Sequence, residues 1–134
     1  PIMGMTYLWD TNIVIYYLQQ QLSPAAARFI DSTLLYNAPA LSVVSEIELL
    51  CWRNATEEQR DVLQGFIYAT VVFGLSDKIK RMTVDIRRAC NVKLPDAIIA
   101  ATALAYDCTL LTSNTKDFKT VSGLHVIDPT RHDG

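Results

Sequence analysis

The chain has 134 residues, of which 50% are hydrophobic and 19% are charged, and its formal net charge at pH 7 is −2. This length predicts one domain with a sizeable core, and the composition excludes an intrinsically disordered chain. The slightly negative net charge argues against a protein that simply coats nucleic acid.

In the first half of the chain, short apolar segments alternate with segments of helical character. Residues 5–9 are typical of a buried strand, and residues 10–21 of a helix that follows it. Ser23 and Pro24 are typical of the N-cap and first position of a second helix, expected to run to about residue 32. The next expected elements are a strand at 38–44, a helix at 45–54, a helix from the capping box of Thr56 and Gln59 to about residue 69, and a strand at 70–75.

The second half of the chain begins with an amphipathic segment. Residues 77–91 place five apolar side chains on one helical face, with cations on the other face: Ile79, Met82, Ile86, Ala89 and Cys90. Residues 96–106 are apolar nearly all round, as expected of a buried crossover helix, and strands are expected at 108–112 and 124–127. Continuous apolar strands separated by helices predict an α/β fold with three α/β/α layers and a mainly parallel sheet.

Neither a linker nor an internal repeat divides the sequence. We interpret residues 1–4 as a non-native extension ahead of the natural start, residues 5–129 as one domain and residues 130–134 as a tail. The sequence holds no apolar run near the roughly 20 residues of a membrane span and no secretion-signal pattern at its start, so we expect a cytoplasmic location.

The cysteines and histidines argue against zinc and redox chemistry. Cys51, Cys90 and Cys108 share no metal-binding or redox spacing, and we interpret them as reduced, buried thiols. Because His125 and His132 are the only histidines, a zinc site built on His and Cys is not expected.

Four acidic residues lie where an α/β sheet binds ligands. Asp10, Glu46 and Asp117 follow or lie just beyond the ends of predicted strands, and Asp96 opens the crossover helix behind Pro95. Ligands of open α/β sheets bind outside the carboxyl ends of the strands, so acids that arrive there from different strands can converge. Simpler structural roles exist, because Asp10 also suits an N-cap and Asp96 gains about 0.3–1 kcal/mol from the helix dipole.

Glu46 and Glu48 differ in their expected tasks. With Ser45 as N-cap, Glu48 falls at the third helical position and completes a capping box. This interpretation leaves Glu46 without a structural task and makes it the candidate site residue.

A cluster of four carboxylates needs compensation. Two carboxylates about 4 Å apart repel by about 4 kcal/mol at an effective dielectric constant of about 20, so four around one cleft require protons or a divalent cation. Oxygen ligands without His or Cys favour Mg²⁺ or Mn²⁺ over zinc. Mg²⁺ also binds phosphate oxygens, so the cluster suits phosphoryl-transfer chemistry.

Four segments resemble the PIN-domain family and, within it, the VapC-type toxins of bacterial toxin–antitoxin pairs. They are "YLWDTNIVIYYL", "SVVSEIELL", "KLPDAIIAATALAYDCTLLTSNTKDF" and "GLHVIDP", and the similarity runs from about residue 5 to residue 129. The resemblance implies a PIN-like α/β/α fold and matches Asp10, Glu46, Asp96 and Asp117 to the family's four acids. It also implies that Thr11, Asn12, Thr112 and Ser113 orient the acids or approach a phosphate, with Asn114 as an alternative to Asp117.

The resemblance further implies a metal-dependent endoribonuclease and its partners. The acids would hold one or two Mg²⁺ or Mn²⁺ ions, and hydrolysis of RNA, such as tRNA, would leave a 5′-phosphate and a 3′-hydroxyl. A cognate antitoxin and a homodimer are the expected protein partners. The candidates for contact with the RNA backbone are six clustered cations, Lys78, Lys80, Arg81, Arg87, Arg88 and Lys93. A solvated helix face and a docking site for acidic antitoxin residues are the alternatives for these cations.

Other functions fit the sequence less well. A haloacid-dehalogenase-like domain needs Asp-x-Asp after its first strand, but here the sequence is Asp10, Thr11, Asn12. A receiver domain needs an acidic pair at the end of its first strand and a lysine after a late strand, and the segment "CTLLTSN" of this chain offers no such lysine. A non-catalytic PIN-fold binding or adaptor module would have lost one or more of the four acids. The apolar segments that contain Tyr16, Tyr17, Leu50 and Trp52 are either core or a partner groove or dimer face.

Overall fold

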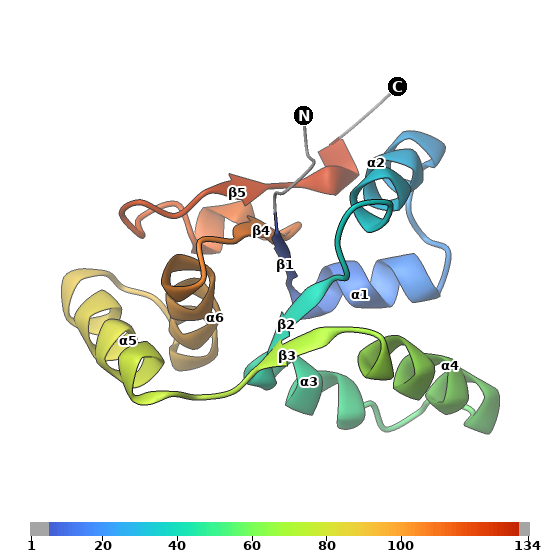
Figure 1. The fold of residues 1–134 in the computed structure, drawn as a ribbon, viewed down its shortest axis with the longest axis horizontal. Helices are drawn as coiled ribbons and strands as arrows, with labels where there is room; N and C mark the ends of the chain where they lie inside the picture. The colour runs from blue at the N-terminus through green and yellow to red at the C-terminus, as the bar shows by residue number, and fades with distance from the viewer. Residues whose placement is uncertain (1–5, 132–134) are drawn as a thin grey trace.

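A computed structural model describes residues 6–131 of the chain (Figure 1). The extension expected at residues 1–4 and the last three residues of the expected tail lie outside the described residues. The elements are, in order, β1 (Tyr7–Trp9), α1 (Thr11–Leu18), α2 (Pro24–Leu34), β2 (Ala40–Ser42), α3 (Val43–Leu50), α4 (Glu57–Tyr68), β3 (Val71–Phe73), α5 (Asp77–Ala89), α6 (Leu94–Ala105), β4 (Thr109–Leu111), η1 (Thr115–Asp117), β5 (Val126–Ile127) and η2 (Pro129–Arg131).

The five strands form one sheet in the order β3-β2-β1-β4-β5, and every pairing is parallel. β1 lies at the centre, where Leu8 is in register with Ala40 of β2 and with Leu110 of β4. The strands are only two or three residues long because the chain turns into a helix or a loop directly after each buried segment. The predicted parallel sheet is confirmed.

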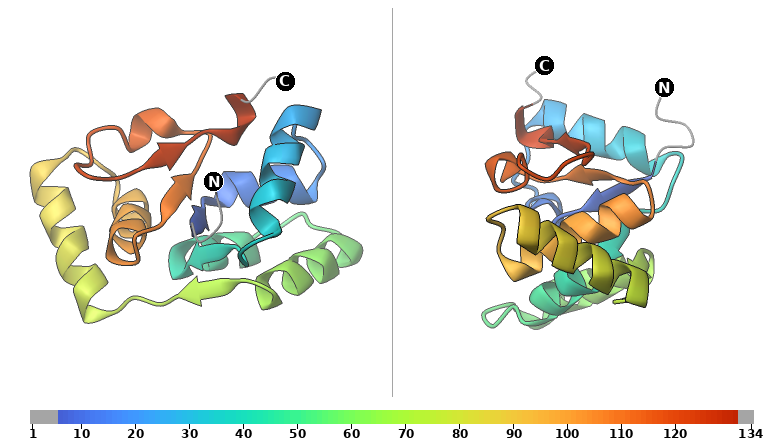
Figure 2. Two further views of the ribbon diagram at one scale, coloured as in Figure 1. Left: turned by 45° about the horizontal axis from the view of Figure 1, so that its top comes forward. Right: turned by 90° about the vertical axis from the view of Figure 1, so that its left-hand side faces the viewer.

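Helices cover both faces of this sheet (Figures 1 and 2). Leu8 points into a core shared with α5 and α6, whereas its neighbours Tyr7 and Trp9 point into a second core with α1, α2 and α4. Adjacent residues of a strand face opposite sides of a sheet, so one strand contributes to both cores. The predicted three-layer α/β/α architecture is therefore confirmed.

The starts of α2 and α4 follow the predicted capping chemistry. The Ser23 side chain accepts a hydrogen bond from the Ala26 backbone, and Thr56 with Gln59 forms both bonds of a capping box. The start of α3 differs from the prediction, because Ser42 is the N-cap and its Oγ accepts from the Val44 backbone at 3.1 Å. The predicted capping box of Ser45 with Glu48 is therefore wrong.

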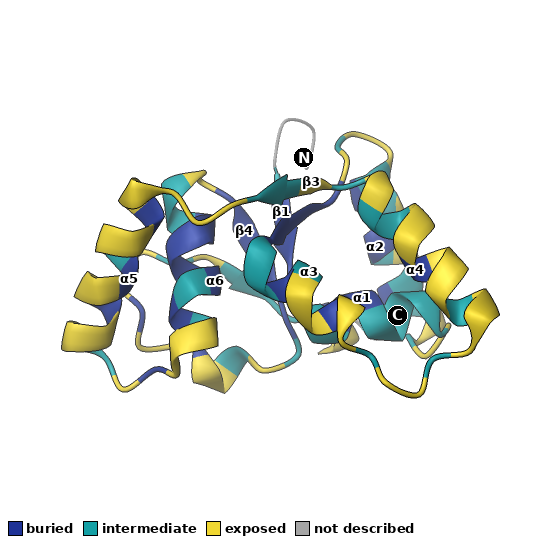
Figure 3. Cartoon of the chain, turned by 90° about the horizontal axis from the view of Figure 1, so that it is seen from below, coloured by how far each residue is buried: buried dark blue, intermediate teal, exposed yellow. Residues whose placement is uncertain are grey.

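Burial corrects two further expectations. Figure 3 shows α5 with a buried inner face and an exposed outer face; Ala89 is exposed, whereas Thr83 is buried and donates its hydroxyl proton to the Ile79 carbonyl at 2.7 Å. All three cysteines are free, but Cys51 is exposed because it follows the last turn of α3. None of the helices within residues 6–131 is long and apolar enough to cross a membrane.

Candidate active site

The candidate site lies at the carboxyl end of the sheet, between β1 and β4. From β1 the chain continues to β2 on one side, and β4 pairs with β1 on the other side. Ligands of open α/β sheets bind at such a switch point, because the connections that leave the two strands diverge there. Asp10 follows β1 and Thr112 follows β4, so both side chains start at the crevice.

Asp10 is buried, with 6% of its surface exposed, and both of its carboxylate oxygens accept hydrogen bonds. Oδ1 accepts from the Thr11 backbone at 2.8 Å, as expected of an N-cap. Oδ2 accepts from Thr112 Oγ1 at 2.7 Å and from Asn12 Nδ2 at 3.3 Å. Three donors therefore fix the orientation of this carboxylate.

The loops after β1 and β4 are joined by further bonds between polar residues. The Ser113 backbone donates to Asn12 Oδ1 at 3.2 Å, and the Asn114 backbone donates to Thr112 Oγ1 at 3.0 Å. The Asp10 backbone donates to the Leu111 carbonyl at 2.8 Å. The polar residues predicted beside the acids thus form one network that holds Asp10.

Asp96 lies in the first turn of α6, directly behind Pro95, and is half-buried. Its pKa is raised by burial and, in decreasing order, by the charges of Asp10, Asp117 and Glu48. The charge of Lys93, at the N-cap position of α6, lowers the same pKa. Three acids from three other segments therefore act on this one carboxyl group.

Glu48, and not Glu46, is the α3 acid that acts on this cluster. Glu48 Oε1 accepts a hydrogen bond from Thr11 Oγ1 at 2.6 Å, and its charge raises the pKa of both Asp10 and Asp96. Glu46 is not among the described groups that shift either pKa. The spacing of the acids alone did not separate Glu48 from Glu46, because both lie within the first two turns of α3.

The cluster carries more negative charge than its surroundings favour. Burial raises the pKa of Asp10 more than any other influence, the Glu48 charge adds to it, and the bonds from Thr112, Thr11 and Asn12 lower it. Carboxylate oxygens without His or Cys fit Mg²⁺ or Mn²⁺. As the side chains lie, no three acidic, His or Cys residues between positions 6 and 131 converge closely enough to hold an ion. An ion at this site would therefore be held by fewer protein ligands and more water, or by these side chains in rotated positions.

The family match covers most of the chain. The PIN domain family matches residues 7–124. The chain belongs to this family. No curated protein matches it significantly.

Solved structures share this PIN fold over nearly the whole chain. A toxin–antitoxin complex from Klebsiella pneumoniae contains a chain that is 28% identical, with a TM-score of 0.73, covering 92% of this chain and 98% of that one. VapBC2 from Rickettsia felis, bound to a promoter DNA fragment, gives 23% identity and a TM-score of 0.79, with 92% and 98% covered. DNA-bound VapBC from Salmonella typhimurium is 20% identical, with a TM-score of 0.80, and the match covers 93% of this chain and 98% of that one. The resemblance found in the sequence is confirmed.

A pocket of about 180 Å³ adjoins the acids of this PIN domain. It is lined by Asn91, Val92, Lys93, Asp96, Lys116, Asp117 and Thr120. Of the six cations predicted to contact RNA, Lys93 alone lines this pocket, and Arg87 reaches its rim by donating from Nη1 to the Val92 carbonyl at 3.0 Å. Lys80 is paired with Asp77 at 3.0 Å on the exposed face of α5.

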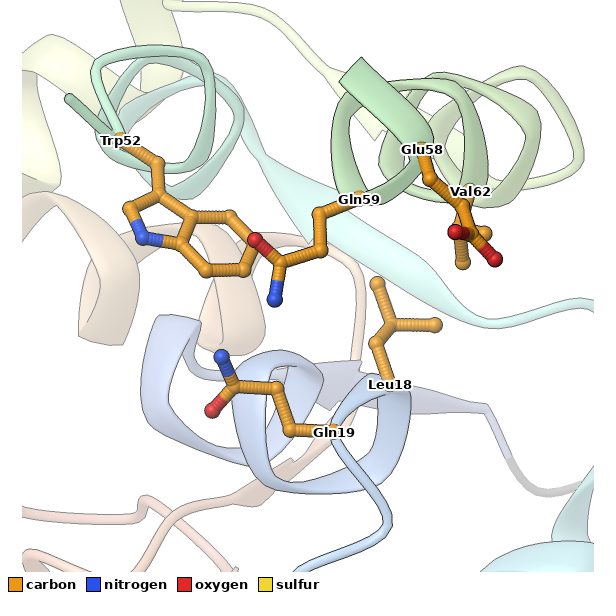
Figure 4. A pocket seen from close by; sticks show the side chains of 6 residues that line it. All are labelled: Leu18, Gln19, Trp52, Glu58, Gln59 and Val62. Atoms are coloured by element: carbon orange, nitrogen blue, oxygen red, sulfur yellow. The ribbon is translucent and has the colours of Figure 1, made fainter. Parts of the chain in front are cut away.

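The PIN domain has a second, more apolar groove between α1 and α4 (Figure 4). Its volume is about 330 Å³, and it is lined by Leu18, Gln19, Trp52, Glu58, Gln59 and Val62. Tyr17 instead packs edge-on against Trp9 in the core, with 5.5 Å between the ring centroids. The apolar segments singled out in the sequence thus divide between core and groove.

Proposed function

We propose that this PIN domain is the ribonuclease toxin of a type II toxin–antitoxin pair and acts on RNA in the cytoplasm. The observation that carries the proposal is the meeting of acids from four segments around Asp96 at the switch point of the sheet, where burial and the charges of the other three raise the pKa of Asp96. The proposed ligands of Mg²⁺ or Mn²⁺ are Asp10, Glu48, Asp96 and Asp117. Glu48 takes the place that the sequence prediction gave to Glu46, because of its contact with Thr11 and its effect on both aspartates.

The residues of the chain have distinct tasks in this scheme. Asp10 is held ready by Thr112 and Asn12, so its oxygens need little reorganisation. A divalent ion held by Glu48, Asp96 and Asp117 would offset the repulsion among these three carboxylates. A bound divalent ion would activate water and stabilise the charge that develops on the phosphate. No side chain is required as a nucleophile.

The proposed protein partners are a cognate antitoxin and a second copy of the chain. Support for the antitoxin comes from the similar chains, which belong to toxin–antitoxin complexes. We assign the antitoxin to the groove of Figure 4, where Leu18 and Trp52 offer apolar surface and Glu58 offers a negative charge to a basic residue. Leu18→Asp is expected to prevent purification of the complex, and Lys119→Asp, outside the groove, to leave it intact.

The first test is cleavage of RNA by the purified, partner-free protein. With Mg²⁺ or Mn²⁺, the wild type is expected to cleave total RNA, and cleavage is expected to stop with EDTA and in Asp96→Asn and Asp10→Asn. Cleavage that persists in these variants would come from a contaminant. No cleavage, together with no calorimetric binding of Mn²⁺, would favour the second candidate, a non-catalytic PIN-fold binding or adaptor module.

A further inference from the structure

We propose that Lys93 and Lys116 form a phosphate-binding site beside the acids, which holds the phosphodiester next to the one that is cleaved. The site takes an RNA backbone phosphate, so its assignment to RNA rests on the proposed function. It adds Lys116 to the predicted RNA contacts, and it assigns to Lys93 a role that the five cations of α5 do not share.

Two distant segments bring the lysines to one pocket. Lys93 precedes α6 and Lys116 lies in η1, and both line the pocket of about 180 Å³ together with Asp96 and Asp117. The Asn91 amide and the Thr120 hydroxyl lie in the same lining and add uncharged hydrogen-bonding groups. The pocket is thus continuous with the acidic cluster, and a phosphate in it lies beside the proposed site of cleavage.

The charges of the pocket are incompletely paired. Within residues 6–131, neither lysine forms a salt bridge, although two carboxylates share their pocket. Lys93 is nevertheless close enough to lower the pKa of Asp96. The four proposed ligands carry up to four negative charges, of which one divalent ion would offset two and two ions would offset all four. With two ions bound, the two lysines would be left without a compensating charge. An anion then becomes the favourable occupant.

The cations of α5 are less well placed to bind a phosphate in this pocket. Four residues connect the end of α5 to the start of α6, and the two helices pack together, so the end of α5 lies nearest the pocket. A helix of 13 residues is about 20 Å long, which puts Lys78 and Arg81 toward the far end. These two cations provide a matched control, because they are exposed and equal in charge to the pocket pair.

Binding of RNA separates the pocket from the chemistry. The wild type, Lys93→Ala/Lys116→Ala and Lys78→Ala/Arg81→Ala are titrated with a fluorescent single-stranded oligoribonucleotide, in Ca²⁺ as an oxygen-binding ion and in EDTA. In Ca²⁺ the pocket variant is expected to bind at least about 10-fold more weakly, and the control within about 3-fold of the wild type. The slope of log K against log salt is expected to fall by about 0.7, the value of one single-strand phosphate. Lys93→Arg/Lys116→Arg is expected to retain binding.

The outcomes distinguish this site from the alternatives. An equal loss of RNA affinity in both alanine variants, or no loss in either, overturns the proposed pocket. Displacement of the RNA by an acidic peptide at equal charge concentration also overturns it, because the lysines would then be assigned to a protein partner. Metal-dependent cleavage by the wild type is measured separately. If cleavage occurs but the pocket variant binds normally, only the pocket fails; if binding depends on the lysines without cleavage, only the nuclease fails.

Discussion

Asp10 and Asp96 lie in one acidic cluster but are held in different ways. Asp10 is buried at the end of a central strand, and three donors from the loops after β1 and β4 fix its carboxylate. Asp96 is only half-buried at the start of a helix, and its pKa responds mainly to burial and to the other acids. Glu48 and Asp117 likewise extend from a helix and a short 3-10 turn.

The difference separates a fixed half of the site from an adjustable half. Backbone pairing between β1 and β4 sets the position of Asp10 before any ligand arrives, which reduces the reorganisation needed in the reaction. We propose that Glu48, Asp96 and Asp117 form the adjustable half, because no three acidic, His or Cys side chains within residues 6–131 converge closely enough to hold an ion as they lie. We therefore expect mutations in the fixed half to change stability as well as activity, and mutations in the adjustable half to change mainly metal binding.

Exchange of each α3 glutamate tests which of them belongs to the adjustable half. Glu48→Gln is expected to lower Mn²⁺ affinity and RNA cleavage by roughly 100-fold, because even residues that only support metal ligands contribute 10–100-fold. Glu46→Gln is the matched control and is expected to stay within about 3-fold. Mn²⁺ calorimetry and cleavage rates measure the two effects. The reverse result would return Glu46 to the site and remove Glu48.

Loss of the Thr112 hydroxyl tests the fixed half. Thr112→Val removes a donor from Asp10 and an acceptor from the Asn114 backbone, both at a fully buried position. The free energy of unfolding is expected to fall by about 1–3 kcal/mol, because buried polar groups are left unpaired. Cleavage is expected to fall about 10-fold as Asp10 loses its orientation.

Thr102→Val provides the control for this measurement, with urea unfolding as the readout. Thr102 is equally buried, but its hydroxyl donates only to the Ile98 carbonyl within α6. A loss below about 1 kcal/mol is expected there, since no charged group loses a partner. Equal losses in the two variants would contradict a special role for Thr112 in holding Asp10.

Local sequence patterns predicted the fold class, but they did not predict the order of the strands in the sheet. Alternation of apolar strands with helices predicted the parallel sheet, and Ser23 and Thr56 marked two helix starts correctly. The order of the strands depends on which helix crosses which face, and this is decided by packing between distant residues such as Leu8 and Leu110. Local periodicity contains no such information.

The candidate site was predicted best where an acid lies directly at the end of a strand or at the start of a helix. Asp10 and Asp96 lie together as expected, because strand ends and helix starts are local features. The error concerned α3, whose first turn overlaps the expected strand at 38–44. Both Ser42 and Ser45 suit an N-cap, and the sequence interpretation chose Ser45, which assigned Glu48 to a capping box that α3 does not contain. Pairing of Ser42 with Phe73 of β3 ends the strand at Ser42, which makes this serine the N-cap.

The pH dependence of metal stabilisation probes both halves together. The pKa of Asp10 and of Asp96 is raised from the ordinary value of 3.8, so in EDTA these groups contribute stability that is complete below pH 3.8 and is lost as the pH rises through their folded values. Mg²⁺ competes with those protons, so its stabilising effect is expected to grow over the same pH range. Thermal unfolding with Mg²⁺ and with EDTA measures the difference. An increment in Tm that is independent of pH would show that no protons are displaced.

The smallest expected effect concerns two buried serines at the start of α3, namely its N-cap Ser42 and Ser45 in its first turn. Ser45 Oγ is buried and has no hydrogen-bond partner among the described residues, whereas Ser42 Oγ caps the helix. Ser45→Ala is expected to raise the free energy of unfolding by up to about 1 kcal/mol, since an unpaired hydroxyl leaves the core. Ser42→Ala is expected to lower it by about 1 kcal/mol, because a helix loses its cap. Urea unfolding of the metal-free protein measures the sign of the change in the free energy of unfolding for both variants. A loss of stability in Ser45→Ala would mean that the hydroxyl has a bound partner, and it would contradict the expected gain.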